Sequence, residues 1–320
     1  MKIKTAFAFA LASCVVAACP LTASAAYPEK PIRWIVPYNP GGGTDSTARI
    51  LQRYIEEQKL LPQPIAPVNV GGAGGSIGAR QVKDAQPDGY TILLHQSALL
   101  IQDANGMSDF GYRDFQPIIS VGVQCMVAGV IADSPYKTYK EIMEAAKAKP
   151  RSVVWGGNIG SANHMAVAAM EHATPGSEFK KVQLGGAAES YAGLKGKVIE
   201  LGNFGVGEIL SFRAGGLRPL ALLADKRDPA IPDVPTAKEL GYDAVFCNEH
   251  NIYAPKNTPA DRVAVLADAF RKALNSDWVK KEMAEKLGQI VIVREGKEFA
   301  DHLAAEMAKM KPMADSMKAK

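Results

Sequence analysis

The feature that most constrains the fold is a unit that occurs twice, in which a short apolar strand runs through a glycine-rich loop into a helix. The first unit is WIVPYNPGGGTDSTARIL at residues 34–51, and the second is VVWGGNIGSANHMAVAAM at residues 153–170. Apolar runs rich in β-branched residues also occur at 91–94 and at 127–131, the latter followed by helical periodicity over 142–148. This order of strand, loop and helix is typical of α/β folds with parallel strands.

The N-terminus has the pattern of a secretory signal peptide. Two lysines precede an apolar run over residues 6–18 that is too short to span a bilayer, and the small residues Ala23–Ala25 follow it. We therefore expect cleavage after residue 25 and export of the mature chain to a periplasm. Cys19 leaves an alternative open, because Val16–Cys19 also resembles a lipoprotein processing site that would leave a lipid anchor.

Charge and cysteine usage argue against several classes of function. The chain holds 37 Lys and Arg against 33 Asp and Glu, a net charge of +4, spread along the sequence without a basic stripe. This distribution disfavours nucleic-acid binding and favours a small-molecule ligand. After the signal only Cys125 and Cys247 remain, and neither belongs to a CxxC motif, so we expect no metal site. In an oxidising compartment these cysteines can pair or stay as free thiols.

Both glycine-rich loops precede a predicted helix, where unpaired backbone N–H groups and the helix dipole attract anions. Glycines let an oxyanion approach this backbone without a Cβ in the way. Gly41–Gly43 with Thr44 and Asp45 suit this role in the first loop, and residues 156–161 suit it in the second. We expect the two loops to face each other and to hold the ends of a ligand with several carboxylates. Ordinary turn chemistry is the alternative for either loop alone.

A third glycine-rich stretch, VNVGGAGGSIGA at residues 68–79, permits three interpretations. It resembles a dinucleotide-binding loop, but it does not follow the first strand, and its glycines have the spacing GxGxxxG in place of GxGxxG. It contains the GxSxG of a hydrolase around Ser76, but Gly71–Ala73 separate the strand from that motif, and no histidine has the context of a general base. We favour a strand, loop and helix in which Ser76 caps the helix and contributes to an anion site. An exported serine hydrolase using Ser76 stays the alternative.

The chain also contains, in this order, YPEKPIRWIVPYNPGGGTDSTARIL, GGAGGSIGA, PDGYTILL, PDVPTAKELGY and IYAPKNTPA. These segments resemble the periplasmic solute-binding proteins of tripartite tricarboxylate transporters, the Bug family. GGNIGSANHMA and GVGEILSFRAGGLRPLAL are similar to the tricarboxylate-binding branch. The resemblance implies an α/β fold, a flytrap-like periplasmic binding protein of type II. Each of its two lobes would contain a mixed, mostly parallel sheet flanked by helices.

The resemblance further implies a domain organisation and a function. Lobe 1 would comprise residues 26–120 and 252–320, and lobe 2 would comprise residues 121–251. The strands that cross between the lobes would bring Cys125 and Cys247 close together, which favours a disulfide. The implied protein is not an enzyme and uses no cofactor; it captures a small organic di- or tricarboxylate and delivers it to membrane permease subunits. A binding protein that feeds a sensor is the alternative, and a monomer is expected.

Positions that match the family give the expected ligand-binding residues. In lobe 1 these are Tyr38, Gly41, Gly42, Thr44, Asp45, Ser76, Gln96 and Ser97. In lobe 2 they are Gly160, Ser161, Asn163, His164, Gly186, Ala187 and Asn203. His164 has two alternative roles, as a protonated ring that adds positive charge to the site or as a cap on its own helix. Because Asp45 does not suit an anion site, we expect its side chain to turn back and cap the helix.

Overall fold

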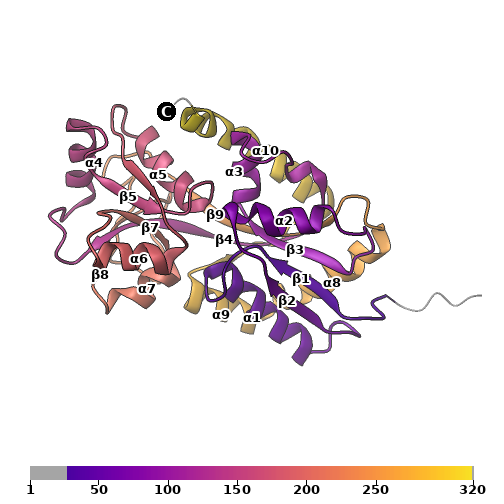
Figure 1. Cartoon of the computed structure of the whole chain (residues 1–320). Helices are drawn as coiled ribbons and strands as arrows, with labels where there is room; N and C mark the ends of the chain where they lie inside the picture. The colour runs from indigo at the N-terminus through magenta and orange to yellow at the C-terminus, as the bar shows by residue number, and fades with distance from the viewer. Residues whose placement is uncertain (1–26, 319–320) are drawn as a thin grey trace, which may run out of the picture.

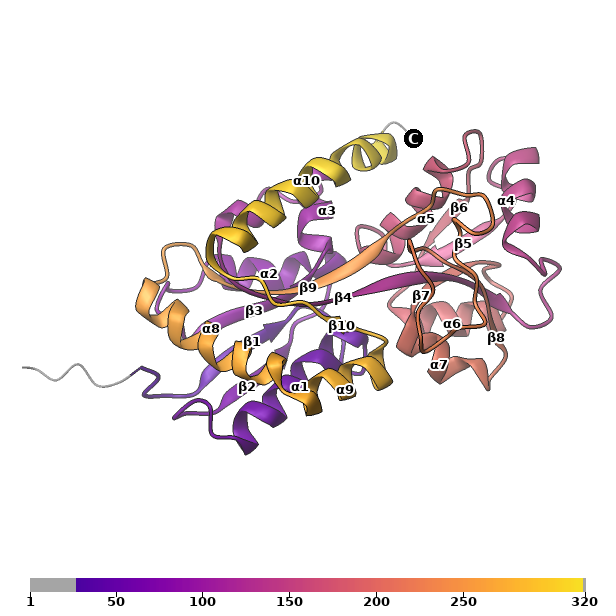
Figure 2. The same ribbon diagram turned by 180° about the vertical axis from the view of Figure 1, so that it is seen from behind.

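A computed structural model describes residues 27–318, so the predicted signal peptide and the lipoprotein cysteine Cys19 lie outside the described residues. Figures 1 and 2 show two lobes joined by two long strands, β4 (Phe115–Ile131) and β9 (Cys247–Pro255). The two-lobed α/β architecture that the sequence predicts is confirmed. Among residues 27–318 no helix is both long and apolar enough to cross a membrane.

Lobe 1 is built on a parallel core sheet. Its central strand pairs in parallel with a neighbour on each side, and one of these neighbours pairs antiparallel with β9. The strands are β1 (Ile32–Val36) in the centre, β2 (Ile65–Asn69) and β3 (Thr91–Gln96). The helices are α1 (Gly43–Glu57), α2 (Ser76–Lys83), α3 (Ala98–Asn105), α8 (Ala260–Asn275) and α9 (Asp277–Leu287), with two 3₁₀ turns, η1 (Ala73–Gly75) and η2 (Tyr112–Asp114).

Lobe 2 combines a small parallel sheet with two strands that extend β4. β5 (Val154–Gly157) and β6 (Lys180–Gln183) pair in parallel, whereas β7 (Gly202–Gly205) and β8 (Leu217–Leu222) pair antiparallel with the second half of β4. The helices are α4 (Tyr139–Ala148), α5 (Ala162–His172), α6 (Ala187–Lys195) and α7 (Val206–Arg213). Helices therefore flank the sheets of both lobes, and β4 belongs to the one large sheet that continues from lobe 1 into lobe 2.

Every pairing that β4 makes with another strand is antiparallel. Its first half pairs with β9 and with the short β10 (Ile290–Val291), because the chain crosses to lobe 2 on β4 and returns on β9 in the opposite direction. Among the named strands of the described chain, the parallel pairs are those of β1 with its neighbours and of β5 with β6. Cys125 lies directly opposite Cys247 where the two strands cross, and the structure joins them in a disulfide. Of the two states that the sequence left open, the structure contains the paired one.

Three groups of buried apolar side chains hold this arrangement together. One fills lobe 1 between the β1 sheet and α8, where Trp34 packs on Phe270 with ring centroids 5.0 Å apart. A second fills lobe 2 around Phe204. The third spans both lobes, because the C-terminal helix α10 (Gly296–Lys318) packs on α3 of lobe 1 and on α5 of lobe 2. Figure 2 shows α10 reaching from one lobe towards the other.

Candidate ligand-binding site

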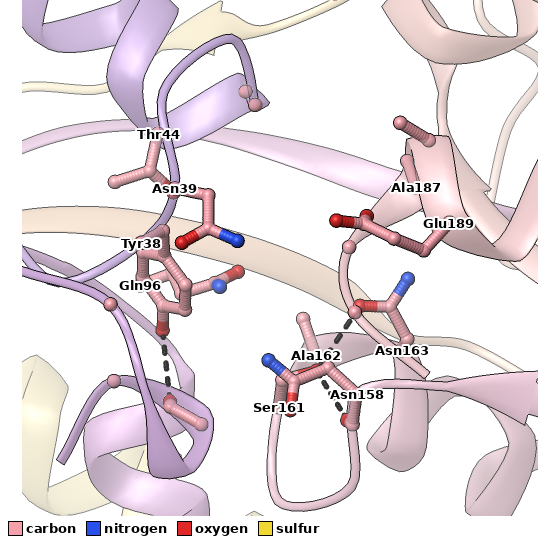
Figure 3. Close-up of a pocket in the computed structure, with 18 of the residues that line it drawn as sticks. Tyr38, Asn39, Thr44, Gln96, Asn158, Ser161, Ala162, Asn163, Ala187 and Glu189 are labelled. Atoms are coloured by element: carbon pink, nitrogen blue, oxygen red, sulfur yellow. Dashed lines mark hydrogen bonds between the residues drawn. The ribbon is translucent and has the colours of Figure 1, made fainter. Parts of the chain in front are cut away.

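A cavity of about 490 Å³ lies between the lobes and is lined by residues from both. Figure 3 shows Tyr38, Asn39 and Gln96 on one side and Asn163, Ala187 and Glu189 on the other. This volume is typical of sites for small organic ligands. The lining is rich in backbone from the three glycine-rich loops that the sequence singled out, at residues 41–44, 71–75 and 158–163.

The first loop presents the start of α1 to the cavity. Gly42 is the N-cap residue, and no side chain caps this helix, so first-turn N–H groups are available to a ligand. Asp45 lies outside the cavity lining, but the expectation that its side chain caps the helix is wrong, because it bonds to the loop before the N-cap residue. Its carboxylate accepts hydrogen bonds from the Gly41 N–H at 2.9 Å and from Arg49 Nε at 2.8 Å, and a further bond comes from Asn69. Burial alone would raise the pKa of Asp45, but these bonds hold it below its ordinary value.

The loop at residues 71–75 closes one end of the cavity. Tyr38 donates its hydroxyl to the Gly74 carbonyl at 3.3 Å, and Gly75 takes φ +101° as the N-cap of α2. A Cβ on Gly75 would lie 2.9 Å from the Tyr38 hydroxyl, so both the backbone angle and the close approach require glycine here. The strand, loop and helix predicted for this stretch are confirmed, but the cap is Gly75 and not Ser76. Ser76 instead donates its hydroxyl to the Ala73 carbonyl at 3.0 Å, because that carbonyl lies one turn before it.

The floor of the cavity comes from the crossing strands. His250 of β9 bonds through Nε2 to the Thr44 hydroxyl and through Nδ1 to Gln289, each at 3.0 Å. Burial lowers the pKa of His250 to about 3, so the ring is neutral and positions the start of α1 without adding charge. Asn248 Nδ2 donates to the side-chain Oε1 of Gln96 at 2.6 Å, which leaves the Gln96 side-chain NH₂ to donate elsewhere.

Lobe 2 presents the start of α5 in the same way. Ser161 is its N-cap residue but does not cap it, because the hydroxyl donates to the Asn158 carbonyl at 2.7 Å. Asn163 is held by a bond from its Nδ2 to the Asn203 carbonyl at 2.7 Å. His164 accepts the Gly160 N–H through Nδ1 at 3.2 Å, and burial lowers its pKa to about 4. Burial therefore favours the neutral form of the ring, which accepts this bond from the loop before its helix.

The charges around the cavity are unusual for an anion site. Among the described residues that line it there is no lysine or arginine, while Glu189 and Glu208 contribute two carboxyl groups. Helix starts and side-chain amides are therefore the groups that can meet a ligand carboxylate. Within residues 27–318 no group of three or more His, Cys, Asp or Glu side chains is placed to hold a metal ion.

Comparison with known proteins places this geometry in a family. The family model described as "Tripartite tricarboxylate transporter family receptor" matches residues 47–317. The chain belongs to this family. BugT from Bordetella pertussis is 31% identical over 81% of this chain and 80% of its own length. The solved periplasmic binding protein BugD is 30% identical, covers 92% of this chain and 98% of its own, and superposes with a TM-score of 0.80.

A more distant structure shares the fold of this receptor family. MatC from Rhodopseudomonas palustris, solved with bound malate, is 23% identical and covers 90% of this chain and all of its own, with a TM-score of 0.81. The family is one of transporter receptors, and BugD is a periplasmic binding protein. The resemblance on which the sequence interpretation depends is therefore confirmed.

The structure divides the residues expected from the receptor family into two groups. Nine of them line the cavity: Tyr38, Gly41, Gly42, Thr44, Gln96, Ser161, Asn163, Gly186 and Ala187. The other six lie outside the lining: Asp45, Ser76, Ser97, Gly160, His164 and Asn203. His164 bonds to Gly160, which is itself outside the lining, whereas Asp45 and Asn203 support the lining residues Gly41 and Asn163 through the bonds above. Ser97 contributes similarly, because its N–H donates to Asn248 at 3.2 Å.

Sequence reasoning missed several polar residues that line the cavity. These are Asn39, Gln124, Gln183, Glu189, Glu208, Asn248 and His250. Asn39 lies next to the first predicted glycine loop, and this position was a signal that could have identified it. Gln124 and His250 belong to crossing strands, where an alternating pattern indicates only that side chains point to opposite faces. Glu189 and Glu208 each lie in the first turn of a helix, where acids are common for reasons unrelated to a ligand.

Proposed function

We propose that this chain is an exported receptor that captures a small organic di- or tricarboxylate between its lobes and delivers it to the permease subunits of a membrane transporter. Export is supported by the signal-like pattern of the first 25 residues, and delivery to a transporter by the family. The receptor acts by binding alone and as a monomer. The lobes close around the ligand, and the permease recognises this closed conformation.

The observation that carries this proposal is the pair of helix starts that open on one cavity from opposite lobes. α1 begins at Gly43 and α5 at Ala162, and neither helix has a side-chain cap. Each helix start offers backbone N–H groups and partial positive charge to a carboxylate. A ligand with a carboxylate at each end satisfies both. The residues proposed to contact it are the nine lining residues, which Asp45, Ser76, Ser97 and Asn203 hold in place through bonds to the lining.

A ligand screen on residues 26–320 tests this function. We would measure thermal unfolding with citrate, tricarballylate, aconitate, C4 to C6 dicarboxylates, aromatic carboxylates and acidic amino acids. A ligand at one hundred times its Kd stabilises the folded state by roughly 2.7 kcal/mol, which raises Tm by about 2 °C or more. Stabilisation by one group of acids, confirmed by calorimetry, is the expected result. Absence of a shift with every acid contradicts the proposal, and covalent labelling of Ser76 by a fluorophosphonate would then favour the hydrolase.

A further inference from the structure

Glu189 differs from the other acids that begin helices in lobe 2. A glutamate at the third position of a helix commonly accepts the N–H of the N-cap residue. Glu208 does this at the start of α7, where its Oε2 accepts the Gly205 N–H at 2.7 Å. Glu189 holds the same position in α6, whose N-cap residue is Gly186, but it makes no such bond. No described residue forms a hydrogen bond or ion pair with its carboxylate.

The Glu189 side chain is directed at the cavity. Figure 3 shows its carboxylate extending from lobe 2 towards Asn39 of lobe 1. A Cβ on Gly185 would lie 2.5 Å from Glu189 Cδ, so the side chain lies over the backbone of residue 185 and glycine makes room for it there. A role in balancing the α6 dipole explains an acid in the first turn. It does not explain why the carboxylate lies against Gly185 and faces the opposite lobe.

A second polar group in the cavity also lacks a partner. The side chain of Gln124, on the crossing strand β4, is buried, with an exposed fraction of 9% for the residue. Its amide lies between two helix starts, because a Cβ on Gly43 of α1 would be 3.6 Å from Nε2 and one on Gly205 would be 3.0 Å from it. No described residue forms a hydrogen bond with this amide, although buried amides normally have partners. The cavity therefore contains a buried amide and an exposed carboxylate, and neither has a partner among the described residues.

We propose that the ligand is a carboxylic acid that also carries a protonated amine, and that Glu189 is the residue that selects the amine. This inference rests on the proposed function, which supplies the carboxylate contacts at α1 and α5. An ammonium group beside Glu189 gives that carboxylate a charged partner in a cavity whose described lining contains no cationic side chain. Gln124 can donate to a carboxylate and accept from the amine at the same time. A carboxylic acid without an ammonium group leaves the Glu189 carboxylate unpaired and adds the negative charge of its own carboxylates to the same cavity.

The test compares acids that differ only by an amine. Calorimetry measures Kd for succinate against aspartate and for glutarate against glutamate, with the wild-type chain and with Glu189→Gln, which keeps the size and removes the charge. A charged hydrogen bond corresponds to at least about a tenfold change in Kd. We expect the wild type to bind at least one aminated acid tenfold or more tighter than its plain partner. Glu189→Gln should abolish this preference without weakening the plain acid.

Glu141→Gln is the matched control, because Glu141 holds the third position of α4 outside the cavity and accepts the Thr138 N–H at 3.1 Å. This variant should keep the preference for the amine. A wild-type preference for the plain acids, or a preference for the amine that survives in Glu189→Gln, overturns the inference and leaves the proposed function standing. The inference alone is also overturned if neither pair binds while other carboxylic acids do. Binding of no carboxylic acid at all overturns the proposed function together with the inference.

Discussion

A substitution at Gly42 can test ligand binding without disturbing the fold. Its backbone has φ −81°, an angle that any residue adopts, and a Cβ there would meet only the Asn39 carbonyl at 3.8 Å, an ordinary contact. Gly41 is different, because its φ of +84° lies in the left-handed region that favours glycine. A side chain at Gly42 should therefore be tolerated by the fold, although it stands over the N–H groups at the start of α1.

We predict that Gly42→Val weakens ligand binding by at least about tenfold with little change in Tm. The branched side chain keeps a carboxylate away from the helix start, and a charge-assisted hydrogen bond to a carboxylate contributes about 1.5–3 kcal/mol. Calorimetry with the acid identified in the screen measures Kd, and thermal unfolding without ligand measures Tm. Gly42→Ala should have a smaller effect, because a single methyl group covers less of the backbone. Wild-type affinity in a folded Gly42→Val chain would place the ligand elsewhere.

At the scale of elements, α3 connects the glycine loops of the two lobes. Gln102 on this helix is buried, and its Nε2 donates to the Gly74 carbonyl at 2.9 Å and to the Gly160 carbonyl at 3.3 Å. Gly74 belongs to lobe 1 and Gly160 to lobe 2, and a Cβ on Gly74 would lie only 3.3 Å from the Ile159 carbonyl. One buried amide thus links the two loops where they touch.

We predict that Gln102→Met lowers both stability and ligand affinity. Methionine keeps the length of the side chain but removes the donor, so buried carbonyls lose a partner, which costs about 1–3 kcal/mol of unfolding free energy. Affinity should fall several-fold, because the arrangement that encloses the ligand loses a bond between the lobes. Urea unfolding and calorimetry measure the two effects. Gln52→Met is the control, since the Gln52 side chain bonds within α1, to Glu56 at 3.2 Å, and not to the other lobe. Unchanged Kd in Gln102→Met would show that this bond does not contribute to closure.

The elements were more predictable from the sequence than the site was. β1 at Ile32–Val36 and the helices after the glycine loops follow from apolar periodicity and from glycine before a helix. The role of β4 was not predictable in the same way, because a strand of 17 residues that pairs with β9 in one half and with β7 and β8 in the other is not encoded by a local pattern. Gln124 lies near the middle of this strand, and its place in the cavity depends on how both lobes dock.

At the scale of the whole molecule, the buried histidines make stability depend on pH. Burial lowers the pKa of His95 and of His164 to about 4 and that of His250 to about 3, from an ordinary value of 6.5. His95 is in β3, His164 in α5 and His250 in β9, so lobe 1, lobe 2 and the crossing strands are all affected. Glu208 has the opposite effect, because burial raises its pKa to about 7 from 4.5.

We predict that the chain becomes less stable as pH falls from 6.5 towards 4.5. In this range the unfolded chain binds up to three more protons at these histidines, each lowering the unfolding free energy by about 1.4 kcal/mol per pH unit. Glu208 offsets about one of them, because here the folded chain holds a proton that the unfolded chain releases. Urea unfolding between pH 7.5 and 4.5 measures the slope, and Glu208→Gln should steepen it by removing the offset. Stability that is constant or rises as pH falls would mean that these histidines take up protons in the folded chain.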